Sequence, residues 1–133
     1  MKLLLDTHTF LWTILNTNRL PAASLRAIQD RQNEVFVSSV SLWEISIKVR
    51  LGKMDLINLT TSDLIPLAAR MGFTPIELLA EEAVTQDQLT EDTHFDPFDR
   101  MLVWQAIYRK FFLVSGDKEL KRFAKDGLRL LWN

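Results

Sequence analysis

The sequence has no cysteine among its 133 residues, so neither disulfide bonds nor a thiolate metal site can contribute to the fold. Its two histidines, His8 and His94, do not form a pair at metal-ligand spacing, which argues against a zinc site. The four glycines are scattered, so the chain has no glycine-rich phosphate loop. No serine stands in a recognisable nucleophile motif, and acyl transfer therefore has no support.

Long apolar runs are absent as well. The apolar run within residues 1–6 is too short for a signal peptide, and no segment approaches the length of a membrane span. Together with the lack of cysteine, these absences lead us to expect a cytoplasmic protein that does not contact membranes. The net charge of −1 also excludes a global positive field that would attract nucleic acid.

Positive charge is concentrated in one segment, residues 109–129, which has seven basic residues against three acidic ones. Taken alone, this excess favours a solvated helix face somewhat over a binding patch. The basic residues are Arg109, Lys110, Lys118, Lys121, Arg122, Lys125 and Arg129. We expect the tryptophans in the core or at an interface rather than as platforms for stacked bases; they are Trp12, Trp43, Trp104 and Trp132.

The length and an ordinary globular composition, 47% apolar and 25% charged, predict a single domain over residues 1–133. Apolar runs predict strands over residues 2–6, 35–38, 73–78, 111–115 and 128–132. Helices are expected over residues 7–15, 20–31, 39–51, 64–70, 79–88, 97–109 and 117–124. This alternation predicts an α/β fold, a parallel sheet covered by helices on both faces. Pro75 places the third strand near an edge of the sheet.

The segment from Asp96 to Ala106 organises this prediction. Pro97 suits the first helical position, and Asp96 suits the N-cap before it. The helix that follows has almost no polar face, so we expect it to be largely buried. Asp99 shares a face with Leu102 and Ala106. A carboxylate over an apolar stripe costs free energy unless another group compensates its charge.

Four acids are expected at the carboxyl edge of the sheet, where parallel α/β folds form their sites. They are Asp6 after the first strand, Glu44 in the helix after the second, Asp99 in the first turn of the 97–109 helix, and Asp117 after the fourth strand. Singly, each has a simpler explanation. Asp6 and Asp117 suit N-caps, and Asp99 suits the helix dipole. Ser41 and Glu44 match a capping box.

Jointly, the capping explanation is weaker, because all four acids are expected at one edge. Carboxylates a few ångströms apart in a poorly solvated site repel by an amount on the order of several kcal/mol. A hard divalent cation is the usual compensation. Oxygen ligands without cysteine or a histidine pair favour Mg²⁺ or Mn²⁺.

Around these acids the chain contains LLLDTH at residues 3–8, SSVSLWEI at 38–45, HFDPFDRML at 94–102 and LVSGD at 113–117. In these motifs it resembles the PIN-domain nucleases, specifically the VapC-type toxins of bacterial and archaeal toxin–antitoxin pairs. The resemblance covers essentially the whole chain, and the motif from residue 94 to residue 106 is specific.

The resemblance implies a three-layer α/β/α fold with a five-stranded, mainly parallel sheet and an endoribonuclease dependent on Mg²⁺ or Mn²⁺. It also implies a homodimer that is inhibited by a VapB-type antitoxin. The catalytic, metal-binding acids would be Asp6, Glu44, Asp99 and Asp117. Thr7, Arg100 and Ser115 are candidates for contacts with the RNA substrate, although Arg100 could equally pair with Asp96.

Three alternatives remain open from the sequence. A PIN-like nuclease could act in RNA maturation or on DNA, outside toxin–antitoxin systems. A phosphatase could use Asp6 as its nucleophile, but the second aspartate common two residues later is replaced by His8. A metal-stabilised interaction domain without activity would not need all four acids.

Overall fold

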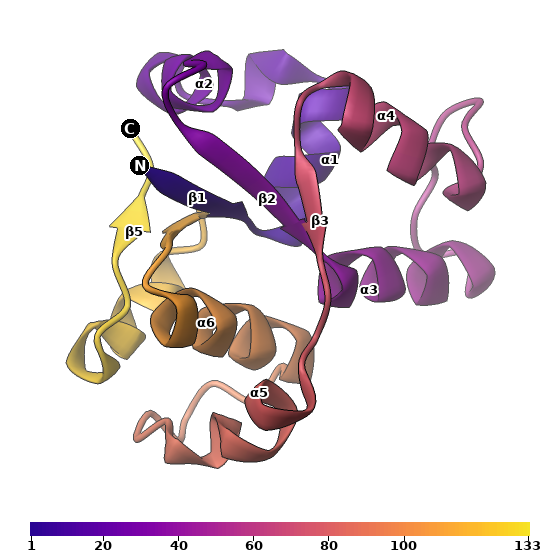
Figure 1. Cartoon of the computed structure of the whole chain (residues 1–133). Helices are drawn as coiled ribbons and strands as arrows, with labels where there is room; N and C mark the ends of the chain where they lie inside the picture. Colours follow the sequence, from indigo (N-terminus) through magenta and orange to yellow (C-terminus); the bar gives the residue numbers. More distant parts are fainter.

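The computed structural model describes residues 1–133 and contains one five-stranded sheet in which all neighbouring strands pair in parallel. The strand order is β3-β2-β1-β4-β5 (Figure 1). The strands are β1 (Lys2–Leu5), β2 (Glu34–Ser38), β3 (Thr74–Ile76), β4 (Phe112–Val114) and β5 (Leu130–Leu131). The predicted parallel sheet is therefore confirmed, and β3, which contains Pro75, lies at an edge as expected.

The helices follow the predicted order with small changes at their ends. They are α1 (Thr7–Leu15), α2 (Ala22–Gln29), α3 (Ser39–Arg50), α4 (Leu64–Arg70), α5 (Ala80–Thr85) and α6 (Pro97–Arg109). Short 3₁₀ helices cover Thr17–Arg19, Thr61–Asp63 and Gln86–Gln88, and a longer one, η4, covers Lys118–Asp126. None of these helices has both the length and the apolar character needed to cross a membrane.

The helix expected over residues 117–124 is present and is a 3₁₀ helix, η4. Its two buried residues, Leu120 and Phe123, are three positions apart. In a 3₁₀ helix with three residues per turn, residues at that spacing lie directly above one another. The 3₁₀ form therefore turns both side chains toward the sheet.

The sheet separates two apolar cores, as the three-layer prediction requires. Leu3 and Leu5 of β1 face the core beneath α1, α2, α4 and part of α3. Leu4 faces the opposite core, which is formed with α6 and η4. This alternation along a fully buried strand gives the α/β/α arrangement, with α1, α2 and α4 on one side of the sheet and α6 on the other (Figure 1).

The strand order places a topological switch point at the centre of the sheet. From β1 the chain continues outward through β2 and β3, and it later returns to the other side of β1 through β4 and β5. Ligand sites in parallel α/β sheets form beyond the carboxyl ends of the strands at such a point. Here that point lies between Asp6, which follows β1, and the segment 115–117, which follows β4.

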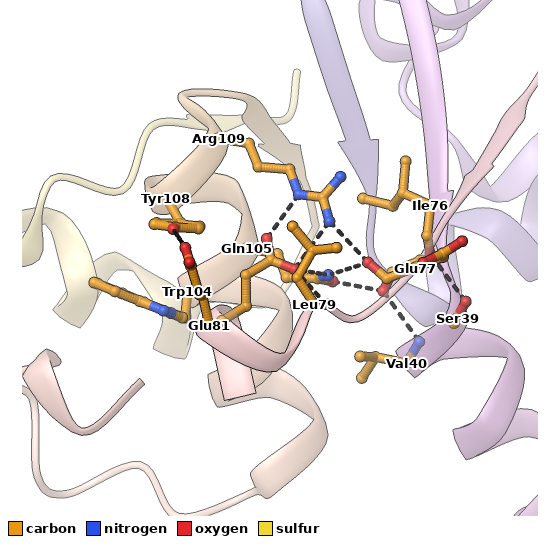
Figure 2. Close-up of polar contacts among 12 residues, drawn as sticks. Ser39, Val40, Ile76, Glu77, Leu79, Glu81, Trp104, Gln105, Tyr108 and Arg109 are labelled. Carbon is orange, nitrogen blue, oxygen red and sulfur yellow. Dashed lines mark hydrogen bonds and ion pairs between the residues drawn. The ribbon is translucent and has the colours of Figure 1, made fainter. Parts of the chain in front are cut away.

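A buried polar network fixes α6 against the rest of the molecule (Figure 2). Gln105 accepts a hydrogen bond from the Ser38 hydroxyl at 2.5 Å and donates to the Glu82 carboxylate at 3.0 Å. Arg109 donates to both oxygens of Glu82, at 2.7 and 2.9 Å. The Ser38 hydroxyl also caps α3 by accepting from the backbone N–H of Val40. The network therefore positions the starts of α3 and α5 relative to α6.

Burial alone would raise the pKa of Glu82, but hydrogen bonds from Arg109 and Gln105 outweigh it and hold the pKa below its ordinary value. A carboxyl with a lowered pKa stabilises the folded state above its unfolded pKa. That stability is lost as the pH falls through the folded pKa.

We expect Glu82→Gln to lower the free energy of unfolding at pH 7 by about 2 kcal/mol, because charged hydrogen bonds in the network are lost. The variant should also lose less stability than the wild type when the pH falls from about 5 to about 3. Urea unfolding across this range measures both effects. Glu77→Gln, a change at an exposed side chain on the same connection, is the matched control. Equal pH dependence in wild type and Glu82→Gln would show that Glu82 does not couple folding to protonation.

Candidate functional site

Two carboxylates and an imidazole come together at the switch point. His94, Asp99 and Asp117 each offer one ligand atom, and these atoms lie within 4.8 Å of one another. The Nε2 of His94 is 3.0 Å from the Oδ2 of Asp99. His94 and Asp99 are half-buried, and Asp117 is exposed, so the cluster is open to solvent. A mixed oxygen and imidazole donor set of this size fits a divalent cation.

The loop that carries His94 is held by side chains from α6 and η4. Arg100 donates through one guanidinium nitrogen to the backbone carbonyls of Glu91 and His94, at 2.7 and 3.0 Å. The His94 ring packs edge-on against Phe123, with ring centroids 5.8 Å apart. These contacts come from residues distant in sequence, so local spacing does not predict them. The signal for His94 in the sequence is its place in the motif over residues 94–102, five residues before Asp99.

Arg100 does not form the ion pair with Asp96 that the sequence allowed, because its guanidinium reaches the loop carbonyls and lies over the ring of Phe123. Asp96 instead caps α6 and accepts hydrogen bonds from the backbone N–H groups of Phe98 and Asp99. The expected contact of Arg100 with RNA stays a prediction.

Asp6 and Asp117 are both N-caps, as the simpler explanation for each predicted. Asp6 accepts a hydrogen bond from the backbone N–H of Thr9 at 2.8 Å, and Asp117 accepts one from that of Glu119 at 2.9 Å. The Ser115 hydroxyl accepts a hydrogen bond from the N–H of Asp117 at 3.1 Å and lies near enough to Asp6 to oppose the rise in the pKa of its carboxyl. Capping thus places these carboxylates at the edge of the sheet, and it does not exclude that they also bind a metal ion.

The capping-box interpretation of Glu44 is wrong. Because α3 begins at Ser39 with Ser38 as its N-cap, Glu44 lies beyond the first turn of the helix. Its carboxylate is buried and accepts hydrogen bonds from the Thr7 hydroxyl and the Lys48 ammonium, each at 2.6 Å. The carboxylate is therefore held from both sides by side chains and does not cap the helix.

The carboxylates of the site are only partly compensated by the protein itself. Burial raises the pKa of Asp99, a hydrogen bond from His94 opposes this, and the carboxylates of Asp96 and Glu44 raise it further. Burial also raises the pKa of Asp6 against its hydrogen bonds with Ser115 and Thr9. Raised folded-state pKa values mean that the charged forms are disfavoured in the folded protein. A bound cation would relieve this penalty.

Lys48 supplies positive charge on the other side of the site. Its hydrogen bond with Glu44 raises its pKa, burial opposes the rise, and the carboxylates of Asp96 and Asp99 add to it. Lys48 therefore stays protonated at neutral pH and offsets part of the acidic charge. Sequence reasoning did not predict Lys48 as a site residue.

The structure thus places all four predicted acids at the carboxyl edge of the sheet, but not in one equal group. Asp99 and Asp117 cluster with His94, and Glu44 accepts a hydrogen bond from Thr7. Asp6 lies near Ser115, which opposes the rise in its pKa. Whether they bind metal or substrate stays a prediction.

An α/β domain with clustered carboxylates at the switch point of a parallel sheet defines a class of proteins whose sites suit cation-assisted chemistry. This chain belongs to the PIN domain family, because the PIN domain model matches residues 3–126. That membership supports a hydrolase acting on nucleic acids. No curated protein matches the sequence.

Solved structures with the same fold include toxin–antitoxin complexes. A chain of VapBC2 from Rickettsia felis, bound to a DNA fragment from its promoter, is 19% identical with a TM-score of 0.71 and 100% coverage of both chains. VapBC-1 from nontypeable Haemophilus influenzae is 13% identical with a TM-score of 0.67, covering 98% of this chain and 97% of the other. FitAB bound to an IR36 DNA fragment is 18% identical with a TM-score of 0.59, covering 97% and 93%. At these identities the likeness establishes the fold.

We expect millimolar Mn²⁺ to raise the melting temperature of the wild-type protein and to raise that of Asp99→Asn much less. A ligand that binds only the folded state at 100 times its Kd adds about 2.7 kcal/mol of stability. Thermal melts in chelator and in Mn²⁺ measure the difference. Asp92→Asn is the matched control, since Asp92 is exposed in the same region and forms no ion pair. An identical response of all three proteins would remove Asp99 from the metal site.

Proposed function

We propose that this protein is a metal-dependent endoribonuclease that acts as the toxin of a toxin–antitoxin pair. The observation that carries the proposal is the cluster of His94, Asp99 and Asp117 at the switch point of a PIN domain, flanked by the buried carboxylates of Asp6 and Glu44. Such a crevice suits phosphodiester hydrolysis, which needs an activated water and neutralisation of phosphoryl charge.

The metal would be Mg²⁺ or Mn²⁺, held by Asp99 and Asp117 with Asp6 and Glu44 nearby. When bound, it would polarise the phosphate and lower the pKa of a water molecule. The imidazole of His94 favours Mn²⁺ if it binds the metal directly, since imidazole suits transition metals better than Mg²⁺. Alternatively, His94 orients Asp99 through its hydrogen bond and leaves an all-oxygen site.

The remaining site residues would orient the attacking water, contact the RNA and balance the negative charge of the carboxylates. Glu44 is fixed by Thr7 and Lys48, so its carboxylate is preorganised to orient the attacking water. The ammonium of Lys48, protonated among the acids, would attract a substrate phosphate. Ser115, between Asp6 and Asp117, and Arg100, beside the His94 loop, are proposed contacts for the RNA backbone.

The partner would be a small antitoxin of the VapB type, and the toxin would act as a homodimer in the cytoplasm. VapBC2, VapBC-1 and FitAB, which share this fold, are complexes of that kind. An acidic crevice would accept an arginine or lysine from the antitoxin, which would occupy the position of the metal and block cleavage.

Asp99→Asn should reduce RNA cleavage to the rate that the wild type shows in chelator, because it removes charge from the centre of the site. Asp6→Asn should do the same, and expression of either variant should no longer arrest growth. A single-turnover assay on a structured RNA, with chelator-treated protein restored by Mg²⁺ or Mn²⁺, measures the effect. Asp92→Asn should cleave like the wild type. Cleavage by Asp99→Asn at the wild-type rate would overturn the assignment.

A further inference from the structure

A hollow of about 310 Å³ opens directly beside the candidate metal centre. It is lined by the segment from Ser115 to Asp117 and by the side chains of Lys118, Lys121 and Trp132. Asp117 belongs both to this wall and to the cluster with His94. Any molecule seated in the hollow would therefore lie next to the reacting centre.

The two lysines of the hollow have no acidic partner. Their neighbours on η4 are neutralised: Arg122 pairs with Glu119 at 2.7 Å, and Lys125 pairs with Glu91 at 3.3 Å. Lys118 and Lys121 are both exposed and form no ion pair. Lys118 and Lys121 are thus the residues of the basic segment whose positive charge in the hollow is available to an anion such as a phosphate.

Trp132 is held in a defined place in the lining of the hollow. A Cβ atom on Gly116 would lie 2.7 Å from two carbons of the indole, so the ring packs directly against the backbone at a position that accepts no side chain. The indole also packs against Trp12, with ring centroids 6.0 Å apart. Its N–H makes no hydrogen bond within the protein, and the half-buried ring lines the hollow.

From these observations we infer that the hollow is a nucleotide subsite, in which a base of single-stranded RNA packs against Trp132 while its phosphates contact Lys118 and Lys121. The inference rests on the proposed nuclease function and extends it to the nucleotide next to the cleaved bond. An aromatic surface beside a cationic rim is the usual combination for single strands. The role goes beyond the core or interface position expected for Trp132.

The size of the hollow and its charge favour RNA over a protein segment. Its volume is at the small end of the range for ligand sites, which suits one nucleotide rather than a duplex or a helix. Its one aromatic wall offers no continuous apolar groove, and two unpaired ammonium groups suit phosphate.

The test is the affinity of a labelled single-stranded oligoribonucleotide, measured by fluorescence anisotropy in chelator, where cleavage does not interfere. The double variant Lys118→Gln/Lys121→Gln should bind more weakly, and its slope of log K against log[salt] should be shallower by about 1.4. Trp132→Leu should weaken binding by roughly tenfold with an unchanged slope, and Trp132→Phe should weaken it less. Lys53→Gln, which removes one charge at another exposed and unpaired lysine, is the control for a charge lost outside the hollow.

Thermal melts of each variant test whether it keeps the fold. Because Lys118 and Lys121 are exposed, their variants should fold, and the test of the subsite then does not depend on Trp132→Leu alone. Wild-type affinity in the double lysine variant, or loss of affinity in it without loss in Trp132→Leu, would overturn the subsite. Cleavage of the same RNA by the wild type in Mg²⁺ is measured in parallel. If cleavage persists while all variants bind equally, only the subsite fails; if the wild type neither binds nor cleaves, the proposed function fails with it. Weakened binding of the VapB-type antitoxin by these variants at unchanged RNA affinity would reassign the hollow to a protein partner.

Discussion

The parallel pairing of β1 with β4 is the constraint on which the site depends. It brings Asp6 and Asp117 to one edge of the sheet, and the backbone N–H of Asp6 donates to the carbonyl of Val114 at 3.1 Å across that pair. The carboxylates of α3 and α6 then converge on the same crevice. Lys48 offsets part of their charge and His94 forms a hydrogen bond with Asp99, but burial still raises the pKa of Asp6 and Asp99. The negative charge that the protein leaves uncompensated is the physical reason to expect a bound cation.

Each group of the site is fixed by contacts that lie outside it. The network of Gln105, Glu82 and Arg109 sets the position of α6 and, through Ser38, the start of α3. On the other side, η4 and Arg100 hold the loop that carries His94. The geometry of the candidate site thus depends on the packing of the whole domain, as preorganised sites require.

The sequence predicted the sheet, the edge position of Pro75 and the edge location of the four acids, because these follow from local apolar patterns and from general rules for parallel α/β folds. The sequence did not predict how the side chains of Glu44 and His94 are held, because contacts between distant residues decide this. Glu44 matched a capping box, but α3 starts earlier and turns its carboxylate toward Thr7. His94 gains its position from Arg100 and η4, which no local pattern encodes.

The central claim is that a divalent cation binds between the carboxylates at the switch point. Anomalous diffraction from crystals grown with Mn²⁺ tests it most directly. The account predicts a peak at metal–oxygen distances of roughly 2.0–2.6 Å from Asp99 and Asp117. The position of the peak relative to His94 would show whether the imidazole is a ligand or orients Asp99. The absence of a peak at this edge in Mn²⁺-saturated crystals, or peaks only elsewhere on the molecule, would contradict the account.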